Sequence, residues 1–219
     1  TNGSKSIFHS GEPSELDVEA IKRESKGSRT IIALGGGSVI DLAKIAKRDL
    51  GIKMIAIPTT VGSGAEVSQF CLITDSKTKK KNVVASFELL PEIVIYNSNL
   101  FKTIPKQKLI YQTIDALSHA IESLVSRMSN PISDIFALSA LDSLYECLEK
   151  ISLGDTNESV MEKIATASFL AGLAQSSAAT GLAHSFSHYF GAKNDIPHSK
   201  AVSIFLLDVL ELNANSTNK

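Results

Sequence analysis

Cysteine, net charge and long apolar runs are all scarce in this sequence, and each scarcity argues against a class of protein. Only two cysteines occur among 219 residues. That is too few for a secreted disulfide scaffold, so we expect a reducing cytoplasm. No uninterrupted apolar run approaches the ~18 residues of a membrane-spanning helix, and the N-terminus lacks the apolar stretch of a signal peptide. The net charge of −1 gives no electrostatic reason to expect nucleic acid or a membrane as partner.

The apolar content, in contrast, is sufficient for a core. At 43% hydrophobic residues, a chain of this length is expected to fold as a globular protein with one large or two small domains. The one concentrated run of charge, Lys77 to Lys81, follows Asp75-Ser76. This context predicts a solvated hairpin tip.

The two halves of the chain have different patterns. The first hundred residues alternate helical and strand patterns, which predicts an α/β layer with largely parallel strands. Ser14 is predicted to cap the first helix with Asp17, and Ser38 the second with Asp41. Strands are predicted at 30–34, 54–57, 70–74, 82–85 and 93–96, and helices beyond Pro105 at 106–126, 132–150, 157–176, 179–191 and 199–212. We therefore expect an α/β domain over 1–104 and an all-helical domain over 105–219.

Glycine is concentrated where the first predicted strand meets a helix. Gly35-Gly36-Gly37-Ser38 lets the backbone approach a ligand closely, and a helix N-terminus offers free N–H groups to a phosphate. A tight turn without a ligand explains the glycines equally well. The loop from Pro58 to Glu66 favours the phosphate site, because it follows the next strand and brings hydroxyl and amide groups to the same edge of the sheet.

Histidines are spaced as one face of a helix requires. Asp115 and His119 are four residues apart, as are His184 and His188, and His198 follows fourteen residues after His184. The spacing of four stacks side chains one turn apart, so each helix offers two donors to one point. One such histidine is more often a packed residue, and Asp115 could cap a helix. The set as a whole favours a divalent metal with nitrogen and oxygen ligands.

Five segments together resemble one known family. The segments GGGSVIDLAK, PTTVGSGAE, DALSHAIES, GLAHSFSH and IPHS occur in the order found in the iron-containing (group III) alcohol dehydrogenases of the dehydroquinate synthase-like superfamily. The resemblance extends from about Thr30 to Asn213. Members of this family are longer at both ends, so this chain would hold a partial α/β nucleotide-binding domain followed by a partial helical metal-binding domain.

The resemblance also implies roles for particular residues. The family's metal ligands correspond to Asp115, His119, His184 and His198. Its pyrophosphate loop corresponds to Gly36, Gly37, Ser38 and Asp41, and its second cofactor loop to Thr59, Thr60, Ser63 and Ser68. Lys81 would contact the cofactor as well. His188 would lie near the nicotinamide and the substrate and relay a proton.

The implied function is a metal-dependent oxidoreductase that transfers hydride between an alcohol or aldehyde and a nicotinamide cofactor. The metal would be Fe²⁺ or Zn²⁺, the cofactor NAD or NADP, and the assembly a homodimer. Two alternatives stay open. One is a zinc enzyme like glycerol-1-phosphate dehydrogenase or dehydroquinate synthase, although the segment Gly62 to Glu66 lacks the Gly-Gly-Lys continuation of the latter. The other is a truncated homologue that binds metal without turnover.

Overall fold

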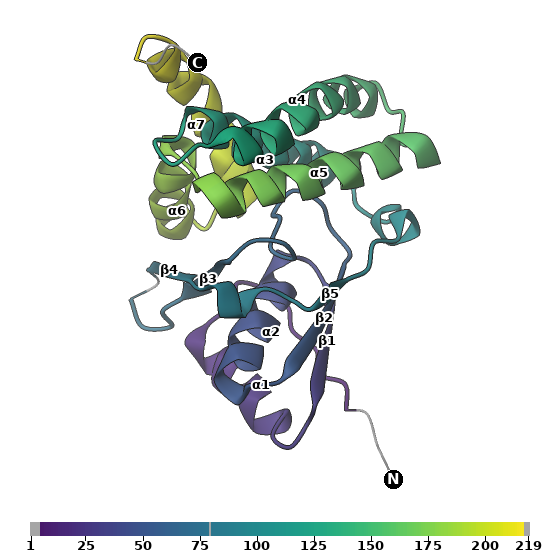
Figure 1. The fold of residues 1–219 in the computed structure, drawn as a ribbon, viewed down its shortest axis with the longest axis vertical. Coiled ribbons are helices and arrows are strands. Elements are labelled where there is room, and N and C mark those ends of the chain that lie inside the picture. The colour runs from purple at the N-terminus through teal and green to yellow at the C-terminus, as the bar shows by residue number, and fades with distance from the viewer. Residues whose placement is uncertain (1–4, 79, 217–219) are drawn as a thin grey trace.

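The computed structural model describes residues 5–78 and 80–216, and it places strands and helices in two halves (Figure 1). The first half is a small α/β layer. Its elements are α1 (Glu15–Glu24), β1 (Thr30–Gly35), α2 (Gly37–Leu50), β2 (Lys53–Pro58), β3 (Phe70–Thr74), β4 (Lys81–Ala85), the 3₁₀ turn η1 (Phe87–Leu89), β5 (Ile93–Val94) and the 3₁₀ turn η2 (Ser98–Phe101). This half confirms the α/β prediction.

The strands form a parallel sheet and a separate hairpin. In the sheet, β1 pairs with β2 and β2 with β5, all parallel, with Ala33 opposite Ala56. Because β1, α2 and β2 form a crossover unit, the carboxyl ends of β1 and β2 lie at one edge. The hairpin pairs β3 with β4 antiparallel. Asp75 accepts hydrogen bonds from the backbone of Lys77 and Thr78, and these residues and Lys80 form the exposed tip that was predicted. Lys79 lies outside the described residues, and Lys81 departs from the prediction because it begins β4 and its side chain is almost buried.

One predicted helix cap is right and the other is wrong. Ser14 and Asp17 form the reciprocal capping box expected for α1. The N-cap of α2, however, is Gly36, and no side chain caps this helix. Because α2 begins earlier than predicted, Ser38 lies inside its first turn. Asp41 lies in the second turn and is too far along the helix to accept a hydrogen bond from the N-cap backbone. Among residues 5–78 and 80–216, no side chain therefore caps the first N–H groups of α2.

The second half consists of five helices, as predicted: α3 (Lys106–Val125), α4 (Pro131–Ser152), α5 (Glu158–Ala178), α6 (Leu182–Asn194) and α7 (His198–Ala214). The first three pack around small buried residues, including Ala116, Ala120, Ala140 and Ala171, and short side chains at these positions allow close helix packing. Helix α7 packs on α6 and α3 (Figure 1). Within residues 5–78 and 80–216, no helix combines the length and the apolar character needed to cross a bilayer.

The strand predicted at 93–96 is shorter in the structure. Ladder pairing ends at Val94, and two residues later the Tyr96 hydroxyl donates a short hydrogen bond to Glu66. Glu66 is almost fully buried in the loop after β2. The side-chain contact of Tyr96 thus joins the segment that leads to α3 to the loop after β2.

Candidate functional site

One cleft between the two halves is lined by every residue predicted to bind the metal or the cofactor or to act in catalysis. Its volume is about 800 Å³, and its lining draws on α2, the loop after β2, β3, β4, α3, α5, α6 and α7. The predicted site residues on it are Gly36, Gly37, Ser38, Asp41, Thr59, Thr60, Ser63, Ser68, Lys81, Asp115, His119, His184, His188 and His198. The structure therefore brings the predicted metal end and the predicted nucleotide end into a single space.

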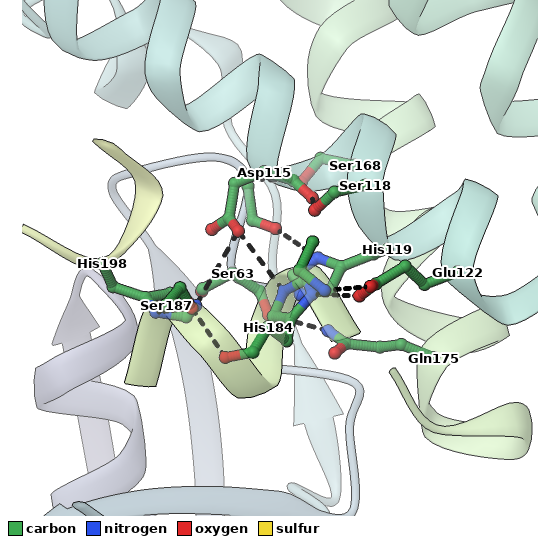
Figure 2. A network of polar contacts seen from close by, with 12 residues as sticks. Ser63, Asp115, Ser118, His119, Glu122, Ser168, Gln175, His184, Ser187 and His198 are labelled. Carbon is green, nitrogen blue, oxygen red and sulfur yellow. Dashed lines mark hydrogen bonds and ion pairs between the residues drawn. The ribbon is translucent and has the colours of Figure 1, made fainter. Parts of the chain in front are cut away.

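Three side chains converge at the helical end of the cleft (Figure 2). Asp115 comes from the middle of α3, His184 from α6, and His198 is the first residue of α7. The Asp115 Oδ1 atom is 3.5 Å from His184 Nε2 and 3.8 Å from His198 Nε2. One ligand atom from each residue lies within 4.8 Å of the others. This spacing fits a divalent ion with one oxygen and two nitrogen ligands.

His119 lies beside this group but is not part of the three-atom cluster. It is one turn after Asp115 on α3, and its ring stacks on that of His184 at 4.4 Å between centroids. Its Nδ1 atom is 3.0 Å from the carbonyl oxygen of Gly62, which leaves Nε2 as the ring nitrogen available to a ligand. A fourth ligand at His119 therefore stays a prediction.

Two buried atoms of the cluster lack a hydrogen-bond partner among the described residues. They are Asp115 Oδ1 and His184 Nε2, which face each other. A buried polar atom without a partner costs about 1–3 kcal/mol of stability, so natural proteins rarely keep one without a reason. A divalent cation between them would accept a lone pair from each. The donor set therefore fits a metal, because these two atoms lie 3.5 Å apart without a hydrogen bond and could both coordinate one ion.

The charge states of the cluster suit metal binding. Burial raises the pKa of Asp115, but the facing rings of His198 and His119 outweigh this effect and hold it at about 2. Burial lowers the pKa of His119 to about 4 and that of His198 to about 3. His184 differs: its contacts with two carboxylates outweigh burial and raise its pKa to about 9. Near neutral pH Asp115 is ionised, the imidazoles of His119 and His198 are neutral and that of His184 is protonated, so metal binding would release a proton from His184.

His188 is on the same face of α6, one turn beyond His184. Its ring centroid is 6.3 Å from that of His184 and 5.2 Å from that of His198. Burial and the neighbouring positive charge of His184 lower its pKa to about 4. It is half-buried, lines the cleft and is outside the three-atom cluster. A neutral imidazole at this place can accept a proton from a group bound in the cleft.

At the sheet end, two loops touch through glycines. A Cβ on Gly36 would lie 2.9 Å from Thr60 Oγ1, and a Cβ on Gly37 would lie 2.9 Å from Ser63 Oγ. The glycines thus let the start of α2 approach the hydroxyls of the loop after β2. The free N–H groups of α2 and these hydroxyls face the same cleft, which is an arrangement suited to a phosphate.

Two charged side chains of α2, the buried Lys44 and the partly buried Asp41, fix the loop after β2 and strand β3 to this helix. Lys44 is fully buried, and its Nζ donates to the carbonyls of Ala65 at 2.8 Å and Phe70 at 2.5 Å. Asp41 accepts a hydrogen bond from the backbone of Leu72 at 3.0 Å. Burial raises the pKa of Asp41, and the ammonium of Lys44 opposes this shift. The carboxylate of Asp41 is therefore already engaged with β3, and its contact with a cofactor stays a prediction.

The remaining predicted residues are Lys81, Ser68 and Thr59, which also line the cleft. Lys81 begins β4 with a side chain only 5% exposed, and its Nζ is 3.0 Å from the carboxylate of Glu12. Ser68 is buried, and its hydroxyl donates to the carbonyl of Phe70 at 3.2 Å. Thr59 donates its backbone N–H to Gly35 at 2.9 Å, which closes the edge of the parallel sheet.

Sequence reasoning missed Lys44 and one further residue, Glu122. Glu122 is on α3, and its carboxylate is in contact with His184 (Figure 2). Its spacing of seven from Asp115 and three from His119 was a usable signal, because it places all three on one helix face. Burial raises the pKa of Glu122, but hydrogen bonds from His184 and the backbone outweigh it, so the carboxylate is ionised.

Two family models match nearly the whole chain. The model described as "Iron-containing alcohol dehydrogenase" matches residues 5–98, and the model described as "Fe-containing alcohol dehydrogenase family, C-terminal" matches residues 109–219. Together they match both halves of the fold and each side of the cleft.

Individual relatives agree with the family models. An NADPH-dependent butanol dehydrogenase of Clostridium saccharobutylicum is 35% identical over 85% of this chain and 53% of its own length. A probable alcohol dehydrogenase of Escherichia coli, EutG, is 34% identical over 93% of this chain and 56% of its own. The chain thus spans about half the length of these relatives. Such relatives do not favour the alternative of a glycerol-1-phosphate dehydrogenase or dehydroquinate synthase.

Solved structures show the same fold. The crystal structure of sulfoacetaldehyde reductase from Bifidobacterium kashiwanohense in complex with NAD⁺ has a TM-score of 0.85 and 28% identity, covering 93% of this chain and 60% of that one. An iron-containing alcohol dehydrogenase from Thermotoga maritima has a TM-score of 0.84 and 27% identity, covering 91% and 60% respectively. The predicted fold class is therefore confirmed.

Proposed function

This chain belongs to the iron-containing alcohol dehydrogenase family, and on that premise we propose that its cleft transfers hydride between a small alcohol or aldehyde and a nicotinamide cofactor. One observation carries the proposal. A cluster of metal-type ligands and an uncapped helix N-terminus beside a hydroxyl-rich loop line the same cleft. Hydride transfer requires this proximity, because the substrate carbon and the nicotinamide ring must touch.

At the helical end, Asp115, His184 and His198 would hold the metal, with His119 as fourth ligand. Fe²⁺ is the ion that we propose, with Zn²⁺ as the alternative that this ligand set also accepts. When bound, the ion supplies Lewis-acid stabilisation of the charge that develops on the substrate oxygen. The chain's own contribution is to keep Asp115 ionised and to orient the imidazoles so that their Nε2 atoms face one point.

At the sheet end, small residues would bind the nucleotide. The proposed set is Gly36, Gly37, Ser38, Asp41, Thr59, Thr60, Ser63, Ser68 and Lys81. The free N–H groups at the start of α2 would bind the pyrophosphate, and the nearby hydroxyls would donate to it. The cofactor is NAD or NADP: relatives include one named as NADPH-dependent and one solved with NAD⁺.

His188 would handle the proton that accompanies hydride transfer. Its ring lies beside the rings of His184 and His198 and lines the cleft, and its neutral form would accept a proton from the substrate hydroxyl or from a water next to it. Because it is not needed as a ligand, its loss would affect turnover more than metal binding.

Several broader statements are part of the same proposal. We propose that residues 1–104 act as the nucleotide-binding domain and 105–219 as the metal-binding domain, although 1–4 and 217–219 lie outside the described residues. A cytoplasmic location is supported by Cys71 and Cys147, which are both buried and unpaired. A homodimer is the proposed assembly. A chain that holds the metal without turnover is the outcome to be excluded by experiment.

The test is metal analysis of anaerobically purified protein combined with nicotinamide titration. We expect about one Fe²⁺ per chain and saturable binding of NADH or NADPH, with neither bound by heat-denatured protein. Metal binding without nicotinamide binding would instead identify a non-catalytic homologue. Nicotinamide binding without metal would contradict the ligand assignment.

A further inference from the structure

Glu122 is the most deeply buried carboxylate near the ligand cluster, and it is not itself one of the clustered ligands. It lies on α3, one turn beyond His119, and its side chain is 1% exposed. Burying an ionised carboxylate is unfavourable unless several donors surround it. The partners of Glu122 therefore indicate what this burial achieves.

Each oxygen of Glu122 has a partner in or next to α6 (Figure 2). The backbone N–H of Ala183 donates to Oε1 at 2.6 Å. Nδ1 of His184 is 2.6 Å from Oε2, and because the carboxylate is ionised, Nδ1 carries the proton and donates it. The Glu122 carboxylate therefore accepts one hydrogen bond from the first turn of α6 and one from the His184 ring.

Helix α6 has no cap of its own. Its N-cap residue is Gly181, which has no side chain to accept a hydrogen bond. A Cβ at this glycine would lie 2.9 Å from Glu122 Oε1, so only a glycine admits the carboxylate this closely. Glu122 thus supplies from α3 the acceptor that a serine or aspartate normally supplies from within the chain.

We propose that Glu122 is the positioning residue of this site: it caps α6 and fixes the His184 ring with its proton on Nδ1, so that Nε2 is directed at Asp115 and His198. The part of this proposal that concerns metal rests on the proposed function. The same arrangement recurs at the other rings, because His119 Nδ1 faces the Gly62 carbonyl at 3.0 Å and His198 Nδ1 faces Ser187 Oγ at 3.4 Å. Glu122 differs from both in being charged, so it makes the stronger contact.

An amide cannot replace this carboxylate, although it has the same shape. Glu122 accepts two hydrogen bonds from two donors on different oxygens. A glutamine has one oxygen, and its NH₂ group would face either the Ala183 N–H or the His184 Nδ1–H. In the first case α6 loses the acceptor at its N-terminus. In the second case His184 adopts the tautomer with its lone pair on Nδ1 and its proton on Nε2, the atom that should bind the metal. Glu122→Gln therefore tests the charge and the second acceptor oxygen of the carboxylate while the volume of the side chain stays the same.

The experiment measures Zn²⁺ affinity by competition with a chromophoric chelator in the parent, in Glu122→Gln and in Glu92→Gln. Glu92 is the matched control, because it also accepts a backbone N–H, that of Met54 at 2.6 Å, but does not line the cleft. We expect Glu122→Gln to bind Zn²⁺ about 10–100-fold more weakly, as is typical when the carboxylate behind a ligating histidine is lost. Glu92→Gln should match the parent. Equal Zn²⁺ affinity in the parent and in folded Glu122→Gln would overturn the proposal.

A second measurement is made on the parent protein alone, so it depends neither on metal binding nor on whether Glu122→Gln folds. Nitrogen-15 NMR of the metal-free parent should show a proton on Nδ1 of His184 that exchanges slowly with solvent. An unprotonated Nδ1 would overturn the positioning role even if Zn²⁺ binds. If Nδ1 is protonated but the parent takes up no Zn²⁺, the proposed function fails while the contact between Glu122 and His184 stands.

Discussion

At the nucleotide end of the cleft, the functional groups are backbone N–H groups and small hydroxyls on two loops that touch through Gly36 and Gly37. At the end proposed to bind metal, they are ionisable side chains on three helices, and the Nδ1 atom of each of the three rings His119, His184 and His198 has a polar partner behind it. If the first end binds the nucleotide as proposed, it would distribute binding over many weak contacts, so each substitution should have a modest effect. The second concentrates binding in a few strong contacts, and each substitution there should have a large effect.

The largest effect is expected for His184→Ala. This change removes one of three clustered ligands and leaves Glu122 buried without its imidazole partner. Metal affinity should fall by at least about a thousandfold, or about 4 kcal/mol, as measured by elemental analysis after dialysis. His9→Ala, at the one histidine outside the helical half, should bind metal like the parent.

His119→Ala tests whether the metal end has a fourth ligand. If His119 is a fourth ligand, this variant should lose stoichiometric metal as His184→Ala does. Undiminished occupancy would restrict the ligand set to the three clustered residues, Asp115, His184 and His198.

His188→Ala should come next in size. Metal and cofactor should remain bound, because the side chain is outside the cluster, while turnover falls by roughly two to four orders of magnitude, as expected for a removed general base. The measurement is single-turnover hydride transfer as a function of pH. An unaltered rate and pH profile would make His188 a packing residue.

Gly37→Val tests the nucleotide end. The new Cβ would lie 2.9 Å from Ser63 Oγ and would push the second loop away from the start of α2. Gly37 is the first residue of α2 and not a residue of positive φ, so the expected damage is steric and not a backbone strain. Nicotinamide affinity should weaken by about tenfold or more, about 1.4 kcal/mol, with metal content unchanged. Calorimetry that shows equal affinity would remove these loops from the phosphate site.

The smallest effect is expected for Lys81→Met. The Lys81 ammonium would be one of many groups that contact the nicotinamide cofactor. Its charge is also partly neutralised by the carboxylate of Glu12 at 3.0 Å. Nicotinamide affinity should fall by about threefold to tenfold, with a weaker dependence on salt than in the parent. The control is Lys80→Met, because Lys80 is an exposed neighbour that does not line the cleft. An equal loss in both variants would indicate a general charge effect.

The sequence predicted the parts of this structure that depend on local spacing. Asp115 and His119 share a helix face because the helix period fixes it, and Ser14 caps α1 because its partner Asp17 is three residues away. The cap predicted at Ser38 was wrong for a related reason. Three consecutive glycines permit the helix to begin before the first residue with a capping side chain, and the pattern of polar residues alone does not reveal this.

Contacts between distant segments were beyond the reach of such patterns. Lys44 looks like a surface residue of α2 but is fully buried, because two carbonyls from the loop after β2 and from β3 surround its ammonium. Glu122 acquires its role only when α6, about sixty residues later, brings Ala183 and His184 to it. The contacts of supporting residues such as Lys44 and Glu122 depend on tertiary packing. The residues that line the cleft itself can be predicted from their spacing in the sequence.

The central claim is that the metal end and the nucleotide end act together on one substrate. The most direct measurement is oxidation of NADH or NADPH by a short aldehyde, followed before and after removal of the metal from anaerobically Fe²⁺-loaded protein. Our account predicts that oxidation stops on chelation and returns when Fe²⁺ is restored, while nicotinamide stays bound throughout. Oxidation that continues at the same rate without metal would contradict it.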